Sequence, residues 1–409
     1  MGMEIYLTQA KSGDCIIVRC GEKKKKVNLL IDSGQGADIF EKALKRVKNN
    51  KENIDMMIWT HDDNDHIKGA CNLLKKIYSD EKQMDTLIYG KLLKNMTEER
   101  ILFNFGGKGL SAPLGAEDVK ELAEKMKGKL DFQKLDFVVS DGEKISYPNM
   151  IQLRWECTEE CLESEVIRNP TIEELNTKKE HLEIIILGPS RENLRKYIES
   201  VWEKQIPLMA RNRYTEREWE KSIQYWMNNA VETEKDDRLE NRVSIAFLIV
   251  YQGMYMLFAG DASPDDMVSE GKKFLKRIGK QQEYLDVAFI KLPHHGSSKN
   301  VNESFLKFFR TKNYLVSTGG NTKNQHPGKK TFAIIANLLE EEGEANIYSS
   351  YDWWKEKEEF CRAERREENW DASGDKCILI DRERRKKQLN FYKLQTSLLE
   401  INPQVFVAR

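Results

Sequence analysis

The chain has 409 residues with 66 basic and 67 acidic side chains, so the net charge is -1 and nothing in the overall balance draws it to nucleic acid or to an anionic membrane. Any site for a polyanion must therefore be local. Charged residues make up 33% of the chain and the mean hydropathy is -0.65, which describes a very soluble protein with heavily charged helices.

Seven cysteines, an odd number, are scattered along the chain, which predicts reduced thiols in a cytoplasmic protein. Residues 1–4 lead straight into an apolar strand pattern, so we expect no signal peptide. The length allows one large α/β domain with insertions or two smaller domains.

The most informative element is the strand predicted over residues 54–60, a run of apolar residues. It leads into residues 61–66, which have the sequence His-Asp-Asp-Asn-Asp-His. Apolar residues at helical spacing then predict a helix over residues 67–77. Metal-coordinating side chains therefore fall in a strand-to-helix loop, at the edge of the sheet where α/β folds usually place their chemistry.

The spacing within this hexapeptide predicts two sets of ligands. His61 and Asp63 could face one cation, and Asp65 and His66 could face a second cation about 3.5–4 Å away. The alternative is a charged surface loop with a helix-capping aspartate, because Asp and Asn are favoured at caps and turns.

Two long insertions, residues 91–148 and residues 190–240, lie between the segments that carry the candidate metal ligands. The second is predicted to be helical and interleaves tryptophan with arginine, which could stack on bases and hold phosphates. Its basic and acidic side chains nearly balance, however, so a solvated helical pair with aromatic anchors is the favoured interpretation. Its place near the predicted site suggests a lid or a substrate selector.

Residues 243–260 contain no charged side chain, a length at which a membrane-spanning helix is considered. Gln252 and Gly253 interrupt the run with a turn signal. Each half is rich in β-branched or aromatic residues and has the length of a strand. A buried hairpin is therefore the prediction.

The histidines of the chain number only six, and most of them follow predicted strands. Three apolar strand patterns are predicted over residues 254–259, 286–292 and 314–318. The ligand-type residues that follow these strands are Asp261, then His294 and His295, and then His326. We expect them to gather at one edge of a sheet.

The C-terminal part continues the same fold. Residues 377–381 and 389–392 predict a closing hairpin with a basic turn at 382–387. This turn and the lysines at 23–26 could touch a nucleic-acid backbone, although solvated turns that blunt sheet edges are favoured. Residues 394–409 are predicted to be a C-terminal tail, which could dock a partner.

The order of these motifs resembles the metallo-β-lactamase superfamily. His-x-Asp-x-Asp-His is followed by Gly-Asp after an apolar strand, by His-His-Gly-Ser and by His-Pro. Within that superfamily the chain is similar to the soluble hydrolase domain of ComEC-type competence proteins. The resemblance runs from about residue 3 to about residue 381. It implies an α/β fold of the αββα four-layer sandwich type with helical insertions, and we expect this domain to span residues 1–393.

The resemblance further implies a centre for two divalent metal ions, Zn²⁺ or Mn²⁺. The implied ligands are His61 and Asp63 for the first ion, Asp65 and His66 for the second, Asp261 as a bridge, and His295 as the last ligand of the second ion. His294 is the alternative to His295, which is preferred because it directly precedes the glycine.

Two departures from the superfamily pattern concern the first ion. Most members have histidine where this chain has Asp63, and a carboxylate makes the site harder, which makes Mn²⁺ a rival to Zn²⁺. The superfamily's middle histidine is absent from residues 184–190, where it would be expected, and His181 just before them is a weaker candidate. A vacant first site is therefore an open alternative.

The chemistry follows from the metals. Coordination lowers the pKa of water from about 15.7 to about 7, so a metal-bound hydroxide could attack a phosphodiester, with Asp65 orienting it. His294 and His326 are candidates for contacting the phosphate or protonating the leaving oxygen. Alternatively, His294 orients its neighbour and His326 is a turn residue.

These observations predict a cytoplasmic, metal-dependent phosphodiester hydrolase, most specifically a nuclease acting on DNA or RNA. One rival is a hydrolase of a small substrate, such as a cyclic nucleotide or a thioester. The other is a partner-binding subunit of a bacterial defence or mobile-element system. We expect no membrane contact, and a protein partner or a homo-oligomer stays open.

Overall fold

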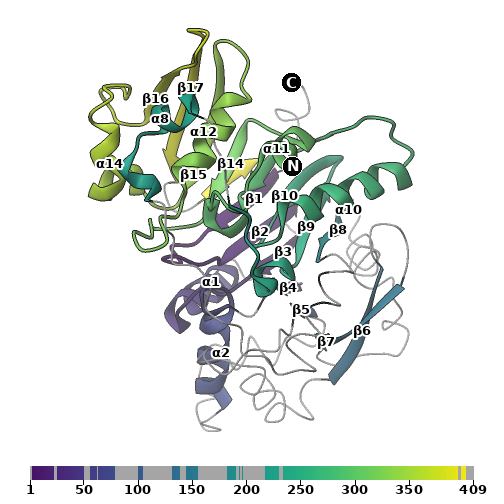
Figure 1. The fold of residues 1–409 in the computed structure, drawn as a ribbon. Coiled ribbons are helices and arrows are strands. Elements are labelled where there is room, and N and C mark those ends of the chain that lie inside the picture. The colour runs from purple at the N-terminus through teal and green to yellow at the C-terminus, as the bar shows by residue number, and fades with distance from the viewer. Residues whose placement is uncertain are drawn as a thin grey trace.

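A computed structural model gives the chain a mixed α/β fold with two large sheets (Figure 1). The structure describes residues 2–22, 25–49, 56–61, 63–78, 100–104, 131–138, 144–154, 182–189, 193, 196, 217–229, 234–394 and 398–401.

The first sheet contains eight strands and is built mainly by the N-terminal part of the chain. In order across the sheet they are β18 (Leu398–Ile401), β1 (Gly2–Leu7), β2 (Ile16–Glu22), β3 (Lys25–Ile31), β4 (Met56–Trp59), β5 (Arg100–Asn104), β7 (Lys144–Arg154) and β6 (Asp131–Val138). Strands β3, β4 and β5 are parallel. Helix α1 (Ala37–Asn49) follows β3, and helix α2 (Asn64–Tyr78) follows β4.

The second sheet also contains eight strands. They are β16 (Lys376–Ile380), β17 (Lys386–Lys393), β15 (Gly343–Ser349), β14 (Asn313–Val316), β12 (Phe289–Lys291), β10 (Met254–Phe258), β9 (Ala246–Tyr251) and β8 (Leu182–Gly188). The uncharged segment at 243–260 forms the antiparallel pair β9–β10, which confirms the predicted hairpin. The predicted C-terminal hairpin is confirmed as the pair β16–β17.

Two predictions of strand extent differ from the structure. The pattern at 286–292 splits into β11 (Leu285–Asp286) and β12, because the chain changes partner there: the N–H of Val287 donates to Arg310, and that of Ala288 donates to Tyr255. Strand β11 instead pairs with β13 (Phe309–Arg310). The tail predicted from residue 394 contains β18, so its residues 398–401 belong to the first sheet.

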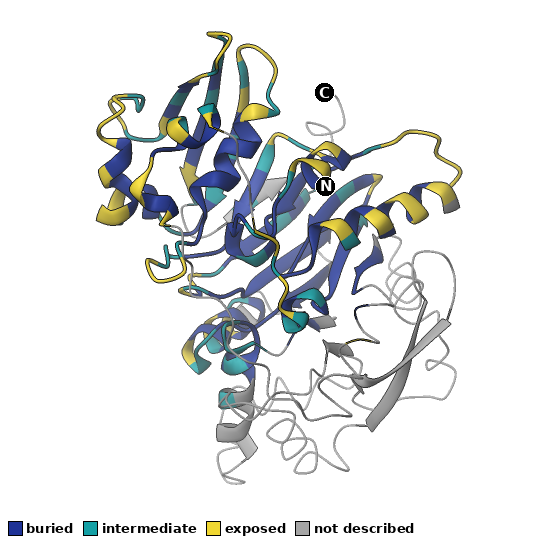
Figure 2. Cartoon of the chain, viewed as in Figure 1, coloured by how far each residue is buried: buried dark blue, intermediate teal, exposed yellow. Residues whose placement is uncertain are grey.

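The central strands of the second sheet are largely buried (Figure 2). Their buried side chains alternate between two cores, one on each face of the sheet. In β9, Phe247 and Ile249 join strands β1 to β4 in a core shared by the two sheets. Leu248 points the other way, into a core with the helices on the opposite face. The sheets therefore pack face to face, with helices behind the second one.

The helices around the second sheet are short. They are α8 (Ile223–Asn228), α9 (Leu239–Arg242), α10 (Pro264–Arg277), α11 (Glu303–Phe308), α12 (Lys329–Asn337), α13 (Trp353–Glu356) and α14 (Glu358–Glu364). Within the described part of the chain, no helix combines the length and the apolar character that crossing a membrane requires.

Most of the predicted insertion at 91–148 lies outside the described residues, and so does much of the one at 190–240. The described end of the second insertion packs onto the core, where Trp219 and Trp226 are buried. Their indole N–H groups donate to the carbonyls of Pro327 and Glu218, respectively. These two tryptophans are therefore anchors of the fold and are not exposed for stacking on bases.

Candidate metal centre

The predicted metal loop begins after β4, as the sequence predicts, but α2 starts at Asn64, three residues earlier than predicted, and includes the last three residues of the hexapeptide. His61 follows the end of β4, and Asp65 and His66 lie in the first turn of α2. The backbone at Gly13 presses against this turn, because a Cβ on Gly13 would lie 1.8 Å from the carbonyl oxygen of Asp65. Glycine is therefore the residue that this close approach requires.

Asp261, at the end of β10, is the point on which three imidazoles converge. Its Oδ2 lies 3.7 Å from Nε2 of His61 and 3.6 Å from Nε2 of His294. Its Oδ1 lies 3.5 Å from Nε2 of His66. The chain segments that follow β4, β10 and β12 thus meet.

His295 completes a second grouping on the α2 side. Its Nε2 lies 3.3 Å from Oδ2 of Asp65. Ligand atoms of Asp65, His66 and His295 all lie within 4.8 Å of one another, and so do those of His61, His66 and Asp261. Both buried groups could hold a metal ion.

Each converging imidazole is oriented through its other nitrogen, a common arrangement for metal-ligating histidines. Nδ1 of His66 lies 2.7 Å from Oδ2 of Asp32, and Nδ1 of His295 lies 2.9 Å from the carbonyl oxygen of Ser317.

The same holds for the other two rings. Nδ1 of His294 lies 3.2 Å from Oδ2 of Asp236, and Nδ1 of His61 lies 3.1 Å from the hydroxyl of Thr60. The Nε2 atoms of all four rings are thereby directed toward the carboxylates of the centre.

The buried polar atoms of the centre provide a test of whether a metal fits. Nε2 of His61, of His66 and of His295, together with Oδ1 of Asp261, are buried without a hydrogen-bond partner. Buried polar groups almost always have a hydrogen-bond partner. Several unpaired nitrogen and oxygen atoms at one place therefore indicate that a bound ligand interacts with them. A divalent cation with imidazole and carboxylate ligands fits this donor set.

The charges of the centre favour a cation. Burial lowers the pKa of His61 to about 4, with a contribution from the charge on His66. Burial would also lower the pKa of His66, but the carboxylates of Asp261 and Asp32 together outweigh burial and raise it well above its usual value. Burial would lower the pKa of His295 as well, but the nearby carboxylates, of which Asp14 has the largest effect, raise that pKa to about 9. The carboxylates thus draw positive charge into a buried site.

Asp63 is placed differently from the other predicted ligands. Its Oδ2 lies 3.9 Å from Nε2 of His61 but only 3.1 Å from Nη2 of Arg238. Asp63 is in neither of the two groups described above.

His326 lies beside the centre, with its ring centroid 4.7 Å from that of His294 and 6.4 Å from that of His295. It is buried and pairs with Asn321 in an isolated bridge, so it is a turn residue that also reaches the site. Burial, together with the charges of His294 and His295, holds its pKa well below the usual value.

Sequence reasoning missed the residues that support the ligands. Asp32 directly follows β3, and no role was predicted for it. Asp236 and Arg238 lie in a charged stretch before α9 that looked like solvated surface, with only the acidic-basic alternation as a signal. Asp14 forms a buried ion pair with Lys291. The weaker candidate His181 lies outside the described residues.

Comparisons with known proteins add no assignment to this geometry. No protein-family model matches the chain, and no curated protein matches it significantly.

Proposed function

We propose that the chain is a metal-dependent phosphodiester hydrolase, specifically a nuclease acting on DNA or RNA, with an αββα sandwich of the metallo-β-lactamase type. One observation carries the proposal: the Nε2 atoms of His61 and His66, which follow β4, lie buried and without a hydrogen-bond partner beside the carboxylate of Asp261, which follows β10. The face-to-face sheets with a shared core support the proposed fold.

The bound cofactor is Zn²⁺ or Mn²⁺, and a pair of ions is expected from the sequence. Such ions supply Lewis acidity toward phosphoryl oxygens and lower the pKa of a bound water. Asp65, His66 and His295 would hold the metal, and Asp261 lies 3.5 Å from Nε2 of His66. Because α2 fixes Asp65 at its first turn, that carboxylate is also placed to orient the attacking water.

Two further histidines act on the substrate. His294 is held at Nδ1 by Asp236, which leaves Nε2 directed into the centre. His326 packs against it from the loop after β14. We assign to this pair the contact with the phosphate or the protonation of the leaving oxygen.

The test is hydrolysis of a chromogenic phosphodiester, single-stranded and double-stranded DNA, and RNA, each with Zn²⁺ and with Mn²⁺. We expect cleavage that a chelator abolishes and that the variants Asp65→Ala and His66→Ala lose. Cleavage unchanged in both variants would exclude the metal mechanism. Metal bound without cleavage of any diester would favour a small-substrate hydrolase or a partner-binding subunit instead.

A further inference from the structure

The two ligand groups share a residue, and this limits how many ions they hold. Both contain His66, and Nδ1 of that ring is engaged by Asp32. Only Nε2 is left for a metal, and one nitrogen lone pair binds one ion. The two groups therefore cannot be filled at the same time through His66, and a second ion would bind through other residues near Asp261, namely His61, Asp63 and His294.

Asp63 already has a cation beside it. Nη2 of Arg238 lies 3.1 Å from the same carboxylate oxygen that faces His61. A guanidinium carries a permanent charge and binds carboxylates and phosphates through its planar fork of donors. Arg238 thus supplies positive charge at the place where the sequence predicts the first metal.

The surroundings of Arg238 match that role. Nε of the guanidinium lies 3.9 Å from Oε2 of Glu240, and its side chain is 45% exposed, so a substrate can reach it. Burial would lower its pKa, but Asp63, Glu240, Asp236 and Asp261 outweigh burial and raise it. Asp63 and Glu240 are the carboxylates that lie within 4 Å of the guanidinium.

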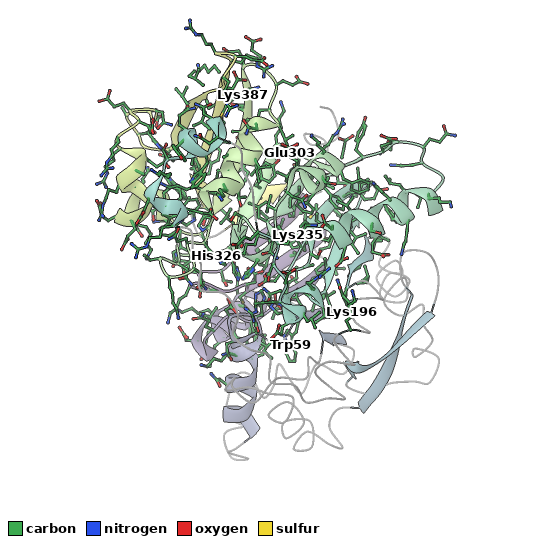
Figure 3. All side chains as sticks on the ribbon, viewed as in Figure 1. Trp59, Lys196, Lys235, Glu303, His326 and Lys387 are labelled. Carbon is green, nitrogen blue, oxygen red and sulfur yellow. The ribbon has the colours of Figure 1, made fainter. Side chains whose placement is uncertain are left out.

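The position of Arg238 is also fixed relative to the site. Its backbone N–H donates to Oδ1 of Asp236, the carboxylate whose Oδ2 lies against Nδ1 of His294. Asn241, one turn further along, donates to the same Oδ2. Figure 3 labels Lys235, which marks the start of this segment. One short stretch of chain thus orients His294 and places the guanidinium.

We propose that Arg238 takes the place of the first metal ion, so that the protein binds one divalent cation at the group of Asp65, His66 and His295 and uses the guanidinium as the second positive charge facing the phosphodiester. This inference rests on the proposed function. It lowers the expected number of bound metal ions from two to one, because Arg238 provides the other positive charge.

The test is the number of metal ions bound after equilibrium dialysis against Zn²⁺ or Mn²⁺, measured by elemental analysis. We expect one equivalent in the wild-type protein and two in Arg238→Gln, because the substitution removes the positive charge that lies beside Asp63. The double variant Arg238→Gln/Asp63→Asn should return to one equivalent. Arg242→Gln is the matched control, since Arg242 lies on the same helix and pairs with Asp266, and it should keep one equivalent.

A second readout uses the wild-type protein alone and does not depend on a variant folding. At rising Mn²⁺ we expect the electron paramagnetic resonance spectrum of an isolated ion, without the coupling of two ions about 3.5–4 Å apart. Two equivalents or a coupled spectrum in the wild type would overturn the inference while leaving the proposed function intact. One equivalent in Arg238→Gln, with a native circular dichroism spectrum, would equally overturn it. No bound metal in the wild type would overturn the proposed function as well.

Discussion

Replacing Asp32 with asparagine tests the orientation of His66 without touching a ligand. The Asp32 side chain is fully buried, and its Oδ2 lies 2.7 Å from Nδ1 of His66 and accepts the Thr60 hydroxyl at 2.8 Å. Its Oδ1 accepts the Thr60 N–H at 2.7 Å. Asparagine has the same shape and tolerates the backbone φ of 54° at this position, so the substitution removes charge with little strain.

The expected loss follows from the contact that the substitution changes. A hydrogen bond to a charged group contributes about 1.5–3 kcal/mol. Partners that orient a metal-bound histidine typically change metal affinity by about 10–100-fold, which is the same range. We therefore expect Asp32→Asn to bind Zn²⁺ about 10–100-fold more weakly than the wild type.

The assay is a competition titration with a chromophoric chelator, with circular dichroism to check the fold. Asp38→Asn is the control, because Asp38 is exposed on α1 and forms only a 3.9 Å ion pair with Lys42. It should leave the affinity unchanged. An unchanged affinity in a folded Asp32→Asn protein would refute the view that Asp32 fixes His66 for a metal.

Three further predictions concern the support of the site. Gly13→Ala should destabilise the protein by about 1–3 kcal/mol in thermal unfolding, because the added Cβ collides with the backbone of Asp65; unchanged stability would contradict that close approach. Burial raises the pKa of Cys15 to about 12, so at pH 9 about one Cys15 thiol in a thousand is ionised. Mass spectrometry should therefore detect alkylation of Cys15 only after denaturation. Lys291→Met should cost about 3–5 kcal/mol in chemical denaturation, since it removes the ammonium group that pairs with the buried carboxylate of Asp14 and leaves His295, 3.3 Å away, as its remaining ionic partner; a loss below 1 kcal/mol would speak against that pair.

The sequence predicted the parts of the site that depend on local pattern. The apolar run before His61 and the helical spacing after His66 placed the hexapeptide at the junction of a strand and a helix, and the structure agrees. The strands before Asp261 and His295 were found in the same way. Because strands that run in the same direction end at the same edge of a sheet, the convergence of their loops could be expected.

What the sequence could not provide depends on contacts between distant segments. Nothing near Asp32 in the chain indicates that it lies against His66, 34 positions later. Arg238 and Asp63 are 175 positions apart, and each alone looks like a surface charge. The pairing of β18 with β1 joins the two ends of the described chain, and a short apolar strand carries no signal for its partner.

Anomalous diffraction from a crystal soaked in Zn²⁺ tests the central claim most directly. We predict an anomalous peak at the metal edge within coordination distance of Nε2 of His66, between Asp261 and His295. A soaked crystal with no peak at that nitrogen, or with zinc bound only elsewhere on the protein, would contradict the proposal.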